Sequence, residues 1–479
     1  MNVPPDPSAP PDPALINLFA NIVGERYALR QADDIAPYLK ERRDLFHGRA
    51  SIVLRPGSVD EVAAIVRLAD ETRTPIVPQG GNTGLVGGQV PDNSGAEVIV
   101  SLSRLDRVRS VDPEKDAMIL EAGVILADAQ AAAESADRLF PLSLASEGSC
   151  EIGGNISTNA GGTAVLAYGN TRELVLGLEV VLASGEVWNG LRTLRKDNTG
   201  YDLKNLFIGA EGTLGIVTAA ALKLFPKPRG LGTAFVGLAS PDTALALLHR
   251  AKAIAGHALT SFELMSRRSI DFVLAHLPGS RDPLAGHHDW YVLLEVSSGR
   301  SDSEARDLVE AIFLDASEAG LIEDGMRAET IEQARALWEI RHAIPDMQGF
   351  EGGSIKHDVS VPVDAMPELI ARGIARVTAM IPGVRPVPFG HVGDGNIHFN
   401  FTQPEGMDKA AFLGRWEEVN AAVHEIVAEL GGSISAEHGI GQLKRALLPQ
   451  FKNAVEIALM RKIKATLDPN GILNPGKVL

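Results

Sequence analysis

Two histidines between Phe389 and Asn400 have the spacing of a metal-binding pair. Asp394-Gly395 is a strong signal for a two-residue hairpin turn, and such a turn would place His391 directly opposite His398 on neighbouring strands. Opposed residues hold their Cβ atoms about 4.5–5.5 Å apart on one face of a sheet, which suits two imidazoles on one metal ion. Asn400 falls on the same face, because it lies two residues beyond His398. We therefore predict that His391 and His398 are metal ligands.

A third ligand must come from another segment, and Glu437 in the run Ser435–Gly441 is the candidate. Three protein ligands leave an open coordination position, which is typical of catalytic rather than structural zinc. His438 follows directly and would serve as a free base. Adjacent strand residues point to opposite sides, so Glu437 and His438 serve one site only if the chain bends there. Gly439 permits such a bend.

Three glycine-rich segments form a second group of candidate residues, namely Pro78–Gly88, Glu147–Gly162 and Gly209–Thr218. Successive N–H groups in such loops converge on an anion without interference from Cβ atoms. Any one of them is equally well explained as a set of tight turns. Together they contain too many flexible residues for that, because each ordered glycine costs roughly 0.5–1 kcal/mol relative to alanine. We predict a large planar cofactor with a diphosphate, although the chain has neither a Rossmann fingerprint nor a P-loop.

Composition narrows the class of protein. The 479 residues carry a net charge of −16, which argues against nucleic acid as the main partner because phosphate binding needs a basic surface. Cys150 is the one cysteine, so an internal disulfide or a cysteine metal cage is excluded, and we expect it to be a small buried residue. No run reaches 18 apolar residues, so no transmembrane segment is predicted. The Pro-rich start lacks the features of a secretory signal. We expect a cytoplasmic location.

The elements that must position these residues can be followed along the chain. Ser58 and Glu61 form a capping-box pattern before a helix with its apolar face at positions 62, 65, 66 and 69, and a buried strand ends at Pro78. Short strands then dominate as far as Pro228, with a hairpin about Ser184-Gly185. Beyond Pro228 a strand-then-helix rhythm repeats three times, which indicates an antiparallel or mixed sheet with helices on one face.

We predict an α+β protein with two main domains. The expected divisions are a disordered leader over 1–14, a cofactor-binding domain over 15–228, a substrate or cap domain with the metal-site hairpin over 229–408, and a helical C-terminal segment over 409–479.

The three glycine-rich motifs, P-Q-G-G-N-T-G, G-G-N-I-S-T-N-A-G-G and G-A-E-G-T-L-G-I-V-T, resemble the FAD domain of the vanillyl-alcohol oxidase/p-cresol methylhydroxylase superfamily. Within it they are most similar to the D-2-hydroxy-acid dehydrogenases, which include D-lactate and D-2-hydroxyglutarate dehydrogenases. The resemblance runs from about residue 50 to the C-terminus. It implies that superfamily's two-domain FAD-binding fold, with the C-terminal segment packing back on the FAD domain.

The resemblance also implies which residues hold FAD, through the three loops and the L-N-P-G-K run near the C-terminus. The cofactor-binding residues are expected to be Pro78, Gly80, Gly81, Asn82, Thr83, Gly84, Gly148, Gly153, Gly154, Ser157, Thr158, Asn159, Gly161, Gly162, Gly212, Ile216, Val217 and Asn474. Some members of the superfamily attach FAD covalently through a histidine. The first loop has no histidine, so we expect non-covalent FAD.

At the metal site the resemblance implies that His391, His398 and Glu437 bind a divalent metal ion, with zinc as the first candidate. It also implies that His438 accepts a proton. It places Arg341 and Lys356 around the substrate carboxylate, with Asn400 as a further substrate-binding residue. Pro345 departs from the family pattern, because we associate a threonine with that position in the 2-hydroxyglutarate enzymes. Proline cannot make the same contact, so we lean slightly towards monocarboxylates such as D-lactate.

The expected reaction is oxidation of a small D-2-hydroxy acid to the 2-oxo acid, with metal-assisted removal of the hydroxyl proton by His438 and hydride transfer to flavin N5. One alternative is an FAD subunit of a larger, glycolate-oxidase-like complex. Another is a zinc hydrolase, which leaves the glycine-rich loops unexplained. The electron acceptor is not identified by the sequence, with an electron-transfer flavoprotein or a quinone as the candidates, and a homodimer is one expected assembly.

Overall fold

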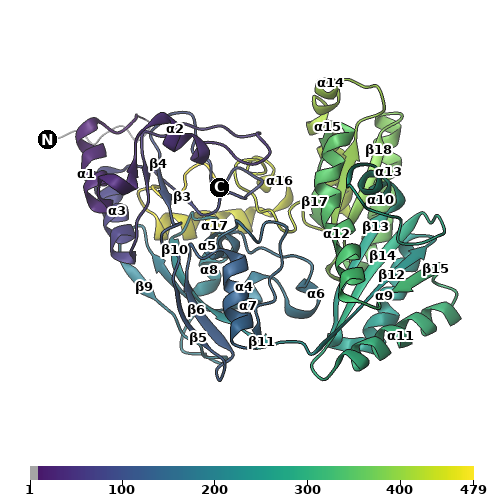
Figure 1. Ribbon diagram of the computed structural model, residues 1–479. Helices are drawn as coiled ribbons and strands as arrows, with labels where there is room; N and C mark the ends of the chain where they lie inside the picture. The colour runs from purple at the N-terminus through teal and green to yellow at the C-terminus, as the bar shows by residue number, and fades with distance from the viewer. Residues whose placement is uncertain (1–8) are drawn as a thin grey trace. The chain divides into compact units, whose positions relative to one another are not determined.

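The computed structural model describes residues 9–479 and divides into two compact units (Figure 1). The first unit comprises the chain up to Gly161, then Asn170–Lys227 and His438–Leu479. The second unit comprises Gly162–Gly169 and Pro228–Glu437. Most of the expected leader over 1–14 lies outside the described residues. Its end does not fit the expectation, because the Asp12 side chain caps helix α1, Pro13–Val23, so that residues 13 and 14 are helical.

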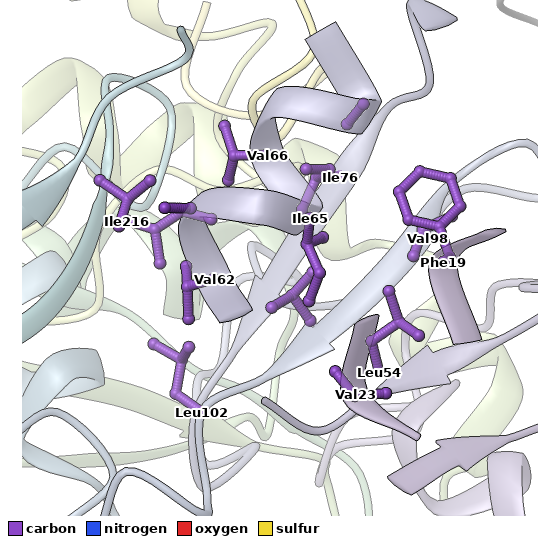
Figure 2. Close-up of a cluster of buried hydrophobic side chains, with 14 of the residues drawn as sticks. Phe19, Val23, Leu54, Val62, Ile65, Val66, Ile76, Val98, Leu102 and Ile216 are labelled. Atoms are coloured by element: carbon purple, nitrogen blue, oxygen red, sulfur yellow. The ribbon is translucent and has the colours of Figure 1, made fainter. Parts of the chain in front are cut away.

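The first unit contains a four-stranded sheet in the order β1-β2-β4-β3, with β2 and β3 parallel to β4. These strands are β1 Ala28–Leu29, β2 Val53–Leu54, β4 Val98–Ser101 and β3 Ile76–Gln79. Helix α3, Val59–Thr72, covers the sheet and begins as predicted, with the Ser58 side chain accepting from the Glu61 N–H. Side chains from α1, α3 and this sheet form an apolar core (Figure 2).

A second sheet of this unit is antiparallel, in the order β5-β6-β10-β8-β9. Its strands are β5 Val108–Asp112, β6 Ala117–Glu121, β10 Ile216–Lys223, β8 Val175–Val181 and β9 Val187–Asn189. The hairpin between β8 and β9 turns at Ser184-Gly185 as predicted, with Gly185 at φ 77°. The short strands β7, Arg138–Leu139, and β11, Phe225–Pro226, pair with each other.

The remaining elements of the first unit are short helices and the C-terminal segment. Its other helices are α2 Ala32–Ile35, α4 Leu126–Ser135, α5 Ile152–Ser157, α7 Thr171–Leu174, α8 Lys204–Phe207, α16 Leu448–Phe451 and α17 Ala454–Leu467, with 3-10 turns at Glu25–Tyr27 and Ala36–Tyr38. After α17 the chain returns to the first sheet, where Leu473 bridges to Ile76. Lys477 then forms a fully buried ion pair with Glu97, 2.9 Å from Nζ to Oε1.

The second unit is built on an eight-stranded antiparallel sheet, in the order β15-β12-β14-β13-β18-β19-β16, with β17 also on β19. Its strands are β12 Gly230–Leu238, β13 Leu259–Ser266, β14 Trp290–Ser298, β15 Asp324–Arg327, β16 Ser354–Ile355, β17 Asp358–Ser360, β18 Arg385–His391 and β19 Asn396–Thr402.

Helices cover both faces of this sheet, contrary to the expectation of one face. Gly232 of β12 lies against Ala305 and Val309 of α11, whereas Phe235, on the opposite face, joins a core with residues of α10 and α12. The repeated strand-then-helix pattern in the sequence did not predict α10 and α12. It therefore predicted the helices on one face of the sheet and missed those on the other. The helices are α6 Val165–Tyr168, α9 Pro241–Ala255, α10 Arg267–His276, α11 Asp302–Glu318, α12 Ile331–Met347, α13 Met366–Met380, α14 Lys409–Leu413 and α15 Trp416–Glu429, with 3-10 turns at Gly256–Ala258, Gln348–Glu351, Val363–Ala365 and Val392–Asp394.

The expected division at residue 409 is displaced in the structure, because residues 409–437 belong to the second unit. Helix α15 packs on α13 there. Ser433 then exchanges both backbone hydrogen bonds with Ser360 of β17, at 2.7 and 3.0 Å. The chain therefore rejoins the first unit only at His438.

Candidate functional site

The two predicted histidine ligands lie close together, although in a different register from the one expected. His398 pairs with Phe389 across β18 and β19, and His391 pairs instead with Glu263 of β13. The register differs because the turn is longer than two residues. It contains a 3-10 segment over Val392–Asp394, followed by Gly395 at φ 83°. Being two residues from Phe389, His391 is the diagonal neighbour of His398. Their ring centroids are 5.4 Å apart.

Glu437 completes the group of three candidate ligands. One carboxylate oxygen lies 3.6 Å from Nε2 of His391, and the other lies 3.9 Å from Nε2 of His398. A ligand atom from each of the three residues falls within 4.8 Å of the other two, as ligands around one ion require. Burial raises the pKa of Glu437 to about 7, even though His391 favours the ionised form. The donor set of two imidazoles and one carboxylate therefore fits a divalent metal such as zinc.

The backbone that carries Glu437 is held by Asp358 of β17. The Glu437 N–H donates to one Asp358 carboxylate oxygen at 2.9 Å, and the side chain of Asn396 donates to the other at 3.1 Å. His438 follows Glu437 directly in sequence and is the first residue of the final segment of the first unit. Asp358 and Asn396 were absent from the sequence-based site, and their role depends on pairing between distant segments.

A buried carboxylate connects the candidate ligands to the predicted substrate-binding arginine. Glu263 accepts from Nδ1 of His391 at 2.7 Å and from Nε of Arg341 at 2.8 Å. Burial opposes ionisation of Glu263, but the charges of His391 and Arg341 outweigh it and lower its pKa to about 2. The reverse effect acts on His391, where burial lowers the pKa but Glu263 raises it to about 9. These three residues form one charged, hydrogen-bonded unit.

Lys356 and Asn400, predicted to bind substrate, each have hydrogen-bond partners of their own. Nζ of Lys356 donates to the carbonyl of Pro345 at 3.1 Å, within α12 and one turn beyond Arg341. Asn400 is buried, donates to Gln348 at 2.9 Å and accepts from the backbone N–H of His357 at 3.2 Å. Pro345 thus contacts the predicted substrate-binding Lys356 through its backbone carbonyl, a contact that does not depend on its side chain.

In the first unit the glycine-rich loops pack against one another so closely that several positions exclude a side chain. A Cβ on Gly81 would overlap the carbonyl oxygen of Ser149, and one on Gly212 would come within 2.5 Å of Pro78. Gly154 and the exposed Gly148 differ, because no described atom beyond their chain neighbours and the backbone of α5 lies within 4 Å of a Cβ built there. Gly154 is inside α5, where glycine is unfavourable. A ligand can approach the backbone closely only where such a glycine has open space beside it.

The same loops and the C-terminal L-N-P-G-K run contain buried polar side-chain atoms that lack a hydrogen-bond partner. They are Oε1 of Gln79, Oδ1 of Asn82, Oε2 of Glu151, Nδ2 of Asn155 and Oδ1 of Asn474. Buried polar groups are nearly always satisfied, so a cluster of exceptions indicates a missing partner. Asn82, Asn159, Glu211 and Asn474 also adopt positive φ, between 44° and 55°. Asn82, Asn159 and Asn474 were predicted from the motifs, whereas Gln79, Glu151 and Asn155 were missed.

Glu211 joins the third loop to the segment that follows His438. Its carboxylate accepts from the N–H groups of Ile440 and Gly441 at 2.7 and 2.8 Å. Asn474 donates to the Glu211 carbonyl at 2.7 Å, so the L-N-P-G-K run reaches this loop. Burial raises the pKa of Glu211 to about 7 against the effect of these N–H donors. Ile216 and Val217 lie at the start of β10 and are buried.

Comparison with known proteins gives the class of this chain. Residues 50–190 match the family model described as an FAD binding domain, and residues 227–478 match the model for the C-terminal domain of FAD linked oxidases. The structure of p-cresol methylhydroxylase is similar, with a TM-score of 0.74 and 17% identity over 97% of this chain and 96% of that one. The expected α+β, two-domain fold of this superfamily is therefore confirmed, and the chain is an FAD-dependent oxidoreductase.

More specifically, the chain belongs to the family of FAD-linked oxidases that includes the D-2-hydroxyglutarate dehydrogenases. It is 39% identical to the mitochondrial D-2-hydroxyglutarate dehydrogenase of Arabidopsis thaliana, over 97% of this chain and 81% of the relative. It is 38% identical to the D-2-hydroxyglutarate dehydrogenase of Xanthomonas citri pv. viticola, over 98% of this chain and 97% of that relative. The family resemblance inferred from the motifs is confirmed. Among the described residues, no helix is long and apolar enough to cross a membrane.

Proposed function

We propose that the chain oxidises a D-2-hydroxy acid to the 2-oxo acid, with D-2-hydroxyglutarate as the first candidate and D-lactate as the second. The observation that carries the proposal is the cluster of His391, His398 and Glu437 next to the Glu263–Arg341 pair. The names of the relatives favour the dicarboxylate. The slight preference for monocarboxylates that we drew from Pro345 has no such support.

In this proposal a divalent metal, zinc first, would be held by His391, His398 and Glu437. When bound, the metal supplies Lewis acidity towards the α-hydroxyl, and the flavin accepts a hydride. Three protein ligands leave room for the substrate's own oxygens. The donor set supports this assignment, because two imidazoles and a carboxylate are ordinary zinc ligands.

The remaining steps fall to the side chains. Arg341 and Lys356 would bind the carboxylate through charge-assisted hydrogen bonds, each contributing roughly 1.5–3 kcal/mol, and Asn400 would assist. His438 would accept the hydroxyl proton at an imidazole nitrogen. The C–H bond at Cα breaks with its electron pair leaving as hydride, so one proton and one hydride leave the alcohol as the C=O bond forms.

We propose that FAD is bound without a covalent bond by the loop residues named above. The unpartnered atoms of Asn82 and Asn474, and the open space beside Gly148 and Gly154, support these positions. The loop from Pro78 to Gly84 offers no histidine for attachment. Acid precipitation of the purified protein should leave yellow colour in the supernatant, and colour retained on the polypeptide would contradict the assignment.

The proposed reaction is tested by mixing the protein without oxygen with D- and L-2-hydroxyglutarate and with D- and L-lactate. The flavin absorbance should fall with the D-enantiomers only, and kcat/KM with an artificial acceptor should be highest for D-2-hydroxyglutarate. A chelator should abolish this reduction while the flavin stays bound. Reduction by the L-enantiomers, or by none of the four acids, would contradict the proposal.

The electron acceptor, a homodimeric assembly and a cytoplasmic location remain predictions. The plant relative is named as mitochondrial. An electron-transfer flavoprotein and a quinone analogue, compared as acceptors for the reduced protein, would distinguish the two candidates. If the isolated chain, supplied with substrate, reduces a dye acceptor without any other protein, the alternative of an FAD subunit that works only within a larger complex is excluded.

A further inference from the structure

Glu263 stands at the centre of the candidate site in the second unit, although it is neither a proposed ligand nor a proposed substrate-binding residue. It lies on β13, with 1% of its surface exposed, and is paired in register with His391 of β18. One carboxylate oxygen accepts from Nδ1 of His391 at 2.7 Å. The other accepts from Nε and Nη2 of Arg341 at 2.8 and 2.7 Å. Both oxygens are therefore engaged with functional residues.

This arrangement determines which nitrogen of His391 is available to a metal. An ionised carboxylate can only accept, so Nδ1 of His391 must carry the hydrogen, and Nε2 is left for coordination. Nε2 is also the atom that lies 3.6 Å from Glu437. Hydrogen bonding from the second ring nitrogen to a carboxylate fixes the orientation of metal-binding histidines generally.

We infer that Glu263 is a positioning residue, which holds His391 with Nε2 towards the other ligands and anchors Arg341 through the same carboxylate. This inference rests on the proposed function. It makes the metal ligands and the carboxylate-binding arginine parts of one hydrogen-bonded assembly. Arg341 directs Nε and Nη2 to Glu263, so that Nη1 is the atom best placed for a substrate oxygen.

A second glutamate in the same sheet, which is half-buried, provides the control. Glu295 lies on β14, next to β13, and accepts from Nε1 of Trp338 at 2.8 Å and from Thr233 at 3.3 Å. These side-chain partners are neither candidate ligands nor Arg341. Glu263→Gln and Glu295→Gln therefore make the same chemical change at two positions of one sheet, and only the first removes a hydrogen-bond partner of His391.

The experiment measures zinc affinity of the full-length flavin-bound protein, by competition with a chromophoric chelator. Glu263→Gln should weaken zinc binding about 10–100-fold, as is typical when the outer partner of a ligand is lost. Glu295→Gln should leave the affinity unchanged. Flavin absorbance and the unfolding temperature report on folding. Zinc affinity of Glu263→Gln equal to that of the unaltered protein would overturn the inference.

Two further variants separate positioning from the loss of a buried ion pair. Arg341→Gln breaks the ion pair but leaves the Glu263–His391 hydrogen bond, so zinc affinity should persist while KM for the acid rises. If Glu263→Gln does not fold because Arg341 is left unpaired, the double variant Glu263→Gln with Arg341→Gln removes both charges and should still show the weakened zinc binding. If Arg341→Gln lost as much zinc affinity as Glu263→Gln, the inference would be overturned. An unaltered protein that binds no zinc would overturn the proposed metal site and this inference together.

Discussion

In the second unit the residues of the candidate site are already bonded to one another: Glu263 neutralises Arg341 and receives the His391 N–H. In the glycine-rich loops and the C-terminal run of the first unit, buried polar atoms of Gln79, Glu151 and Asn474 lack partners, as Oδ1 of Asn396 also does beside the site in the second unit. The two regions therefore obtain their order mainly from different sources. The charged cluster is organised by its own side chains, whereas the loops depend on polar contacts that a bound dinucleotide would supply.

The carboxyl groups of the two regions differ in the same sense. Neighbouring cations hold Glu263 ionised in spite of burial, and lower its pKa to about 2. In the loops burial outweighs the opposing effects of Arg55 on Glu151 and of Lys444 on Glu211, and raises the pKa of Glu151 to about 8 and that of Glu211 to about 7. Burial acts in the same way on Glu437 of the second unit. A neutral carboxyl repels an anion far less than an ionised one does. The loops are therefore better suited to an anionic diphosphate than their acidic residues suggest.

The largest effect is expected from removal of a metal ligand. His391→Ala or His398→Ala takes away one of three proposed ligands, so turnover should be abolished, as it should be by a chelator. Flavin content should be unaffected, since the flavin-binding residues lie in other segments. His249→Ala, on an exposed position of α9, is the control and should retain full activity. Loss of flavin from the ligand variants would contradict the independence of the two regions.

A smaller effect is expected for His438→Ala, which tests a role carried over from the family resemblance. The rate of flavin reduction by substrate, measured by stopped flow, should fall about 10²–10⁴-fold, as for other positioned acid–base groups. Zinc content should stay at the level of the unaltered protein. If zinc is lost in parallel with the rate, His438 is a ligand and the division of roles with Glu437 is wrong.

Two glycine substitutions in the loops should separate ligand contact from chain packing. Gly154→Ala would place its Cβ near no described residue beyond its own helix, so it should stabilise the flavin-free protein by roughly 0.5–1 kcal/mol. It should also weaken FAD binding by about tenfold or more, measured by fluorescence titration, if the cofactor occupies that space. Gly81→Ala would clash with the Ser149 carbonyl and should destabilise the protein even without flavin. Unchanged FAD affinity in Gly154→Ala would argue against a contact there.

The smallest effect concerns pH and Glu151. Burial raises the folded-state pKa of Glu151 to about 8 from an ordinary 4.5, so the folded protein binds more protons than the unfolded chain between these values. The contribution of Glu151 to the free energy of unfolding is fully present below about pH 4.5 and is lost as the pH rises through about 8. Urea unfolding of the flavin-free protein between about pH 5 and about pH 8 should show a smaller decline for Glu151→Gln than for the unaltered chain. Parallel declines would mean that Glu151 is ionised when folded.

Local patterns in the sequence predicted much of the fold and part of the site. The Ser58 cap and the β8–β9 hairpin depend on residues a few positions apart, and both are present. The His391–His398 pair was found for the same reason, but its register was wrong because the turn is longer than two residues. Whether the loop motifs and the three ligands bind as expected stays a prediction until FAD and zinc binding are measured.

Glu263 shows why the rest could not be predicted. It is 128 residues from His391, and only the pairing of β13 with β18 brings them together. One signal was available, since Glu263 sits in the strand Leu259–Ser266, whose eight residues are all buried. A carboxylate in such a run must have a partner. The sequence does not say which one.

The C-terminal segment of the first unit has a consequence for how the protein is made. Leu473 bridges to Ile76, and Lys477 neutralises the buried Glu97, so residues beyond 437 complete a sheet that begins before residue 100. The whole second unit is synthesised between these two parts. The flavin-binding unit therefore cannot be completed in chain order, as contiguous domains are, because Glu97 lacks its Lys477 partner until residues 438–479 have been synthesised. Its second unit, whose main segment is continuous from 228 to 437, is free to fold first.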